Sequence, residues 1–249
     1  KDTANAQPLI VATSLLGAHA LGLTNFAVTS GHSVGELAAA ALSGAISSSD
    51  ALSLVRSRGV EMAKAAAVTP AGMSAVLGGD RNEVLAAIAA LNLVAANDNG
   101  AGQIVAAGDL TALAQLSDNP PASARVRALA VAGAFHTSYM QPAVEPLRAQ
   151  AATIATHPVQ INVISNKDGE VVSDGAEVLT RIVNQIANPV RWDLCMETLK
   201  SLGVTGVIEL PPAGTLVGLL KRAASEIESF ALKSADDLPA AREFAERHL

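Results

Sequence analysis

The chain has 249 residues, of which half are hydrophobic and only 2% are aromatic. This length allows one large domain, or a large domain with a smaller insertion, whose core is built mainly from small aliphatic side chains. The net charge of −6 and the lack of a basic cluster argue against nucleic-acid binding, and no apolar run is long enough to span a membrane. Cys195 is the only cysteine, which excludes an internal disulfide and favours a buried thiol in a reducing, cytoplasmic environment.

The first seventy residues are predicted to alternate between helix and strand. A helix over 4–20 precedes an apolar strand over 26–30, and two helices follow over 34–42 and 50–67. A strand-first α/β fold would not normally begin just before a helix, so we expect the natural protein to extend further upstream.

The next segment has a different order of predicted helices and strands, with Pro70 and Gly72 at its start and Gly133 at its end. Its predicted order is strand, helix, strand, strand, helix, strand, over 73–77, 81–91, 93–97, 103–106, 111–116 and 125–131. This is the order of a ferredoxin-like unit, so we predict an inserted α+β subdomain over residues 71–132.

Helices and strands alternate again after His136. Helices are predicted over 139–154, 177–186, 194–202 and 215–224, and strands over 161–165, 206–210 and near Phe230. Strands separated by helices indicate a mostly parallel sheet covered on both faces. The predicted fold class is therefore α/β, with a core formed by residues 1–70 and 133–249 around the inserted subdomain.

The pentapeptide Gly31-His32-Ser33-Val34-Gly35 lies between the predicted strand over 26–30 and the helix that follows it. In this setting a G-x-S-x-G pattern is typical of a nucleophile elbow, whose tight turn exposes the serine hydroxyl. Both glycines are expected to leave space where a Cβ would collide, and the helix directs its first N–H groups toward Ser33. The alternative is a glycine-rich turn with a capping serine, which does not explain the flanking strand and helix.

A serine nucleophile needs a base, and His136 is the best candidate among the five histidines. It lies between an apolar strand and a helix, a position where catalytic residues gather in α/β folds. His32 lies within the elbow, where its ring is expected to line the site rather than accept the Ser33 proton. Asn97 and Asn99 either form a turn or line the cleft between the core and the insertion.

Arg58 lies on the apolar face of the helix predicted over 50–67, whereas Arg56 points toward solvent. A buried guanidinium requires an anionic partner, because an unpaired charge is very costly to bury. That partner is either a carboxylate of the chain itself or the carboxylate of a substrate held by a bidentate clamp.

Several motifs occur in one order along the chain: Gly31 to Gly35, Arg58-Gly59, Ala96 to Asn99 with Gly102-Gln103, Gly133 to Thr137, Asn188 to Trp192 and Pro212 to Leu216. Together they resemble the malonyl-CoA:acyl carrier protein transacylases, and the resemblance spans essentially the whole chain. That family has an α/β-hydrolase-like core with a ferredoxin-like insertion, in agreement with the predicted architecture.

The resemblance implies a role for each residue at the site. Ser33 would be the nucleophile, His136 its base, and Arg58 the clamp for the malonyl carboxylate. The family lacks an acidic third member, and the backbone carbonyl of Gln185 would orient His136 instead. Val34 would donate one oxyanion N–H.

Phe135 resembles a phenylalanine that accompanies selection of malonyl over methylmalonyl units in related polyketide acyltransferase domains. Exclusion of one methyl group by shape is worth only about 1–3 kcal/mol. Members of the family usually begin with a strand and a Gly-Gln-Gly-Ser-Gln loop, whose glutamine supplies the other oxyanion N–H. These 249 residues contain no such loop.

The implied reaction moves a malonyl group from malonyl-CoA to the phosphopantetheine thiol of acyl carrier protein through a malonyl-serine ester, for fatty acid or polyketide synthesis. We expect a cytoplasmic monomer with no bound metal or cofactor and no membrane or nucleic-acid partner. A serine esterase is the rival enzyme, but esterases of this type place an acid after the serine and the histidine late in the chain, whereas His136 lies mid-chain. A third possibility is an inactive fragment that binds the carrier.

Overall fold

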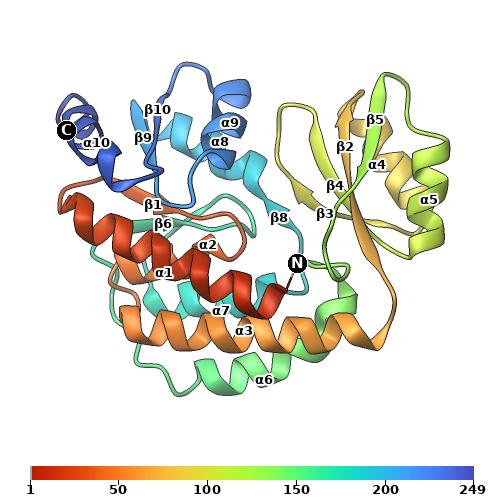
Figure 1. Cartoon of the computed structure of the whole chain (residues 1–249), viewed down its shortest axis with the longest axis horizontal. Helices are drawn as coiled ribbons and strands as arrows, with labels where there is room; N and C mark the ends of the chain where they lie inside the picture. Colours follow the sequence, from red (N-terminus) through yellow and green to blue (C-terminus); the bar gives the residue numbers. More distant parts are fainter. Residues whose placement is uncertain (1) are drawn as a thin grey trace.

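The computed structural model describes residues 2–249 and places two groups of elements side by side (Figure 1). One group contains most of the helices together with short strands, and the other is built on a five-stranded sheet. The segment between residues 72 and 128 forms the second group, apart from one strand that comes from much later in the chain.

The first group begins with α1 (Thr3–Leu21), β1 (Val28–Ser30), α2 (Gly35–Leu42) and α3 (Ser48–Val68). The Ser47 side chain accepts a hydrogen bond from a backbone N–H in the first turn of α3 and so caps this helix. As predicted, one face of α3 is buried: Ala51, Leu54, Val55, Met62 and Ala65. Arg58 is buried with them, and Arg56 is exposed. α1 approaches α3 closely, since a Cβ at Gly59 would lie 3.1 Å from the backbone of Ala4.

The remaining elements follow residue 137, and all of them except β8 belong to this group. They are η1 (Ser138–Met140), α6 (Gln141–Ala151), β6 (Asn162–Ile164), β7 (Val171–Val172), α7 (Gly175–Gln185), β8 (Val190–Arg191), α8 (Trp192–Ser201), β9 (Gly206–Glu209), α9 (Thr215–Ala223), β10 (Glu228–Ala231), η2 (Ala235–Asp237) and α10 (Leu238–Glu246). The sequence prediction lacks β7, β8 and α10. Strands of two residues are too short to show an alternating pattern. In α10 the buried Ala241, Phe244 and Ala245 do recur at helical spacing, so this helix had a readable signal.

The strands of this group form two small sheets rather than one continuous parallel sheet. β6 pairs with β1 in parallel and with β7 antiparallel, while β9 and β10 form a separate parallel pair. β7 is antiparallel because only the turn at 165–170 joins it to β6, and that turn is too short for a crossover. The fold is therefore α/β with mixed sheets.

The second group contains β2 (Gly72–Gly78), α4 (Arg81–Ala90), β3 (Val94–Asp98), β4 (Gln103–Gly108), α5 (Leu110–Asp118) and β5 (Ala124–Ala128). Its strands lie in the order β5-β2-β4-β3 with all neighbours antiparallel, and β8 joins the β3 edge in parallel at Asn97 and Asp98. α4 and α5 cover one face of this sheet over an apolar cluster. The opposite face packs through Met73 and Val105 against Phe135. The sheet is thus fixed to the first group along one edge and one face.

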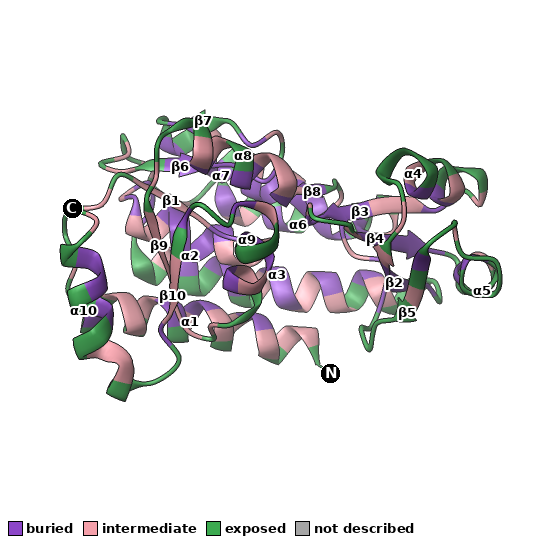
Figure 2. Cartoon of the chain, turned by 90° about the horizontal axis from the view of Figure 1, so that it is seen from above, coloured by how far each residue is buried: buried purple, intermediate pink, exposed green. Residues whose placement is uncertain are grey.

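The main hydrophobic core lies where α2, α3, α6 and α7 meet, and Figure 2 shows the buried residues concentrated there. α2 contributes Leu37 and the alanines at 38–40, whose small side chains let the neighbouring helices approach. Cys195 is buried in a second cluster under α8 and α9, as predicted. No helix within residues 2–249 is both long and apolar enough to cross a membrane.

Candidate active site

The turn between β1 and α2 is the elbow that the sequence predicts. Ser33 adopts a left-handed backbone conformation with φ 53°, and the Gly35 N–H donates to the His32 carbonyl across the turn. A Cβ at Gly31 would lie 2.1 Å from the Gly35 carbonyl carbon, so only glycine fits at position 31. The expectation for Gly35 is wrong, because a Cβ there would meet open space. Position 31 alone carries the steric requirement of this turn.

Ser33 and His136 form a hydrogen-bonded pair, with 2.7 Å between the Ser33 Oγ and the His136 Nε2. His136 also has a left-handed backbone, φ 62°, and its N–H donates to the Ile186 carbonyl at 3.1 Å. Its Nδ1 lies 2.9 Å from the Gln185 carbonyl oxygen. A carbonyl only accepts, so this contact places the proton on Nδ1 and leaves Nε2 to accept the serine proton.

Burial keeps the His136 ring neutral. Desolvation, assisted by the nearby Arg58 cation, lowers the pKa of His136 to about 3, although the Gln185 carbonyl acts in the opposite direction. A neutral imidazole with a free Nε2 lone pair can take a proton from the Ser33 hydroxyl at neutral pH.

Arg58 reaches the same point from α3, and the residue is only 2% exposed. It donates to the Gln7 Oε1, to the Gln185 Oε1 at 2.9 Å and to the Ser33 Oγ at 3.2 Å. All three acceptors are neutral, so the ion pair with a carboxylate of the chain, one of the two alternatives weighed from the sequence, does not form within residues 2–249. Burial lowers the pKa of Arg58 to about 10, which still leaves it charged at neutral pH. Within residues 2–249 this buried cation thus forms no salt bridge, although the nearby Glu36 carboxylate favours its charged form.

Three polar residues that sequence reasoning missed, Asn166, Glu36 and Gln7, hold Ser33, Gln185 and Arg58 in place through hydrogen bonds. Asn166 holds the elbow on both sides, because its Oδ1 accepts the Ser33 N–H at 2.7 Å and its Nδ2 donates to the Gly31 carbonyl at 2.8 Å. Glu36 accepts hydrogen bonds from the Asn166 N–H and the Gln185 Nε2. Gln7, the third, contacts Arg58 from α1. Of the three, only Glu36 had a signal, as a carboxylate in an otherwise apolar helix directly after the elbow.

The structure brings some of the other predicted residues to the site and leaves others apart. His32 lies beside Ser33, with its Nε2 2.8 Å from the Asn99 Oδ1, so Asn99 reaches the elbow through His32. Phe135 is half-buried against both neighbouring clusters. Asn97 is buried in β3, and its side chain makes no hydrogen bond within residues 2–249. The Val34 N–H likewise has no acceptor among the described residues and lies at the start of α2.

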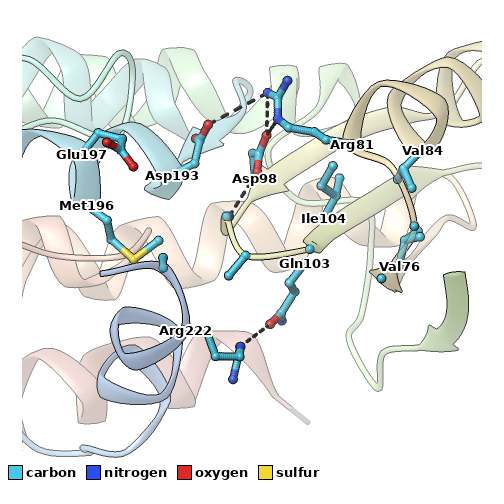
Figure 3. A pocket seen from close by; sticks show the side chains of 16 residues that line it. Val76, Arg81, Val84, Asp98, Gln103, Ile104, Asp193, Met196, Glu197 and Arg222 are labelled. Atoms are coloured by element: carbon cyan, nitrogen blue, oxygen red, sulfur yellow. Dashed lines mark hydrogen bonds and ion pairs between the residues drawn. The ribbon is translucent and has the colours of Figure 1, made fainter. Parts of the chain in front are cut away.

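A separate cavity of about 350 Å³ lies between the five-stranded sheet and helices α8 and α9 (Figure 3). Two of its basic side chains bind other lining residues: Arg81 forms a salt bridge with Asp98 at 2.7 Å, and Arg222 donates to the Gln103 Oε1 at 3.1 Å. Neither Ser33 nor Arg58 lines it. The reactive groups thus lie outside this cavity, and residues 2–249 contain no group of acidic, histidine or cysteine side chains that could hold a metal ion.

A serine–histidine pair at a strand–turn–helix elbow, with the histidine oriented by a backbone carbonyl, is the arrangement typical of α/β enzymes that use a serine nucleophile. Comparison with known proteins then narrows the class. The acyl transferase domain family matches residues 3–242, and the chain belongs to this family.

Several relatives share most of the chain. The malonyl CoA-acyl carrier protein transacylase of Mycobacterium tuberculosis is 52% identical over 242 residues, covering 95% of this chain and 80% of the relative. The protein of the same name from Mycolicibacterium smegmatis is 49% identical, covering 95% and 84%. The crystal structure of MCAT from Mycobacterium tuberculosis superimposes with a TM-score of 0.93 over 97% of this chain and 82% of that one. A malonyl-transacylase in complex with its type II PKS acyl-carrier protein is 28% identical, with a TM-score of 0.90 over 97% and 81%.

Proposed function

We propose that this chain is an acyltransferase that moves the malonyl group of malonyl-CoA to the phosphopantetheine thiol of acyl carrier protein, in fatty acid or polyketide biosynthesis. The observation that carries the proposal is the position of Arg58, a buried cation with no salt bridge within residues 2–249, 3.2 Å from the Ser33 hydroxyl. A site that only hydrolysed neutral esters would have no use for that charge. The names of the relatives point to the same substrates.

In the first half-reaction, the Ser33 Oγ attacks the thioester carbonyl while His136 Nε2 takes the hydroxyl proton. The C–S bond then breaks, the CoA sulfur leaves with the proton returned by His136, and a malonyl-serine ester remains. The Gln185 carbonyl holds the Nδ1–H of the imidazolium that forms between these steps. We assign the stabilisation of the developing oxyanion to the Val34 N–H, which has no acceptor within residues 2–249.

In the second half-reaction, the carrier thiol gives its proton to His136 Nε2 and its sulfur attacks the malonyl-serine carbonyl. The ester C–O bond breaks, and the Ser33 oxygen recovers the proton from His136. Arg58 holds the malonyl carboxylate in both halves, so the reacting carbonyl stays over Ser33. His32, Asn97 and Asn99 line the approach to the elbow, and Phe135 selects malonyl over methylmalonyl by shape.

The architecture fits this role. We assign residues 1–70 and 133–249 to an α/β-hydrolase-like core and residues 71–132 to a ferredoxin-like subdomain, on the basis of the β5-β2-β4-β3 order with α4 and α5 on one face. We further propose that the enzyme works in the cytoplasm as a monomer without a bound cofactor or metal, because the CoA thioester and the carrier thiol supply the chemistry. Light scattering of the purified chain measures its mass in solution and so tests whether it is a monomer.

The direct test is intact-protein mass spectrometry after mixing with malonyl-CoA. A transacylase retains a malonyl group on Ser33 until acyl carrier protein is added, and then transfers it. A serine esterase would lose the group to water, and an inactive carrier-binding fragment would bind the carrier without forming an adduct. Either of these outcomes would reject the proposed function.

A further inference from the structure

The buried carboxylate of Glu36 makes no hydrogen bond to the Ser33 hydroxyl or to the His136 ring, although the Glu36 N–H donates to the Ser33 carbonyl at 3.1 Å. Glu36 lies in the first turn of α2 and is 2% exposed. Its Oε1 accepts the Asn166 N–H at 2.6 Å, and its Oε2 accepts the Gln185 Nε2. Both partners are neutral, and a buried carboxylate with only neutral partners is costly. The role of the Glu36 carboxylate therefore follows from its hydrogen bond to the Gln185 side chain.

The Gln185 side chain lies at the centre of the site with two unlike ends. Its Nε2 is surrounded by acceptors: the Glu36 carboxylate, the Asn166 Oδ1 at 3.2 Å and the Ser33 carbonyl at 3.1 Å. Its Oε1 accepts from the Arg58 guanidinium at 2.9 Å. A reversed amide would place an NH₂ against the guanidinium and an oxygen against three other oxygens. Only one orientation of this amide is therefore compatible with its neighbours.

We propose that Glu36 is a positioning residue that holds the Gln185 amide with its oxygen toward Arg58, and thereby keeps the guanidinium beside Ser33 for the carboxylate of the acyl group. This rests on the proposed function, because that function assigns Arg58 to the malonyl carboxylate. The His136 ring is not part of this path, since the main-chain carbonyl of Gln185, and not its side chain, holds it. The Gln185 side chain contacts Ser33 at its backbone carbonyl and not at the reacting hydroxyl.

A carboxylate does this because it only accepts hydrogen bonds. With Glu36→Gln, the new amide must keep its oxygen toward the Asn166 N–H, so its NH₂ turns toward Gln185. The Gln185 Nε2 then meets an NH₂ where it had an oxygen, so the Gln185 amide either moves off this contact or reverses against the Ser33 carbonyl and the Asn166 Oδ1. In both cases the Arg58 guanidinium loses its hydrogen bond to the Gln185 Oε1.

The test compares malonyl transfer with acetyl transfer, since an acetyl group has no carboxylate for Arg58. We expect Glu36→Gln to lower the malonyl-to-acetyl ratio of kcat/KM about tenfold, mainly through a higher KM for malonyl-CoA. Glu36→Asp keeps an acceptor-only group and should retain most of the ratio even if both rates fall. Glu209→Gln is the matched control, because Glu209 is another buried carboxylate, which binds the N–H groups of 214, 216 and 217 at the start of α9 and should leave the ratio unchanged.

Equal loss of both transfers in a folded Glu36→Gln variant, or no loss at all, would overturn the proposal. Wild-type protein in the same assay separates this from failure of the proposed function, which would show as no malonyl adduct on Ser33. If Glu36→Gln does not fold, Gln185→Met removes the amide and leaves Glu36 in place. An unchanged malonyl-to-acetyl ratio in Gln185→Met overturns the proposal equally. Where Glu36→Gln and Gln185→Met both fold, the variant with both substitutions should have a malonyl-to-acetyl ratio no lower than that of Gln185→Met alone. The reason is that Glu36 positions Arg58 only through the Gln185 side chain.

Discussion

The Ser33–His136 pair and the Arg58 guanidinium meet at one site but are held by different parts of the chain. Ser33 and His136 both have left-handed backbones, and main-chain groups of 185 and 186 fix the histidine. Arg58 is held by two side chains, Gln7 and Gln185, the second of which contacts Glu36. Main-chain contacts persist when side chains change, whereas side-chain contacts do not. The difference indicates that substitutions can alter the choice of acyl group while the reaction chemistry is preserved.

Removal of the nucleophile should affect both acyl groups and is the largest effect expected. Ser33→Ala should lower malonyl and acetyl transfer alike by about 10³-fold or more, because no covalent intermediate can form. Intact mass after mixing with malonyl-CoA measures the missing adduct. Ser30→Ala, three residues earlier at the end of β1, is the control and should still be acylated. A malonyl adduct on Ser33→Ala would place the nucleophile elsewhere.

Removal of the clamp should separate the two acyl groups. Arg58→Ala should lower malonyl transfer about 10²-fold, since the substrate carboxylate loses its partner and the carbonyl its position, while acetyl transfer changes far less. Steady-state kinetics with both thioesters measure this. Arg56→Ala, on the exposed face of the same helix, should change neither. Parallel loss of both activities in a folded Arg58→Ala variant would reject the clamp.

Selection by shape should be weaker than selection by charge. Phe135→Ala should raise methylmalonyl transfer relative to malonyl transfer by about tenfold, because excluding a methyl group is worth only about 1–3 kcal/mol. Competition between the two thioesters, read by mass spectrometry of the acylated serine, gives the ratio. If the ratio does not move, another side chain sets the size of the pocket.

The two parts should also respond differently to pH. With its pKa lowered to about 3, His136 stays neutral at mildly acidic pH, so acetyl transfer should not fall across the usual range of histidine titration. Burial raises the pKa of Glu36 to about 7, although Arg58 and Arg181 act to lower it. Below about pH 7 Glu36 gains a proton and is no longer acceptor-only, so malonyl transfer should fall several-fold on the acid side and recover as pH rises.

Rates of both transfers between about pH 5.5 and 8 measure this difference. The neighbouring Cys195 stays neutral throughout, since burial raises its pKa to about 12. Glu36→Gln should remove the acid-side fall in the malonyl-to-acetyl ratio. Superimposable pH profiles for the two acyl groups in the wild type would contradict the separation of the two parts.

Local patterns in the sequence were enough to locate the three central groups. The G-x-S-x-G turn fixed Ser33, the end of an apolar stretch suggested His136, and helical periodicity put Arg58 on a buried face. These signals lie within single elements, so they need no knowledge of the tertiary fold. Placing Gln185 beside His136 depended on a family resemblance, since no pattern near residue 185 indicates it.

The supporting residues could not be found in this way. Gln7 meets Arg58 from another helix, and Asn166 meets Glu36 across 130 positions of chain. Such contacts exist only once the helices are packed, and a single glutamine or asparagine carries no mark of its partner. The same holds for β8, whose two residues are a strand only because the β3 edge lies beside them.

The late position of residue 185 has a consequence for synthesis on the ribosome. The elbow and the histidine are complete once residue 136 has been made, but the carbonyl that aligns the imidazole and the strand that closes the sheet edge come from 185–191. A nascent chain, or one cut short before that point, would carry a serine and a histidine that are not yet aligned. The growing polypeptide would therefore not acylate itself with cellular CoA thioesters until residues 185–191 had emerged and folded.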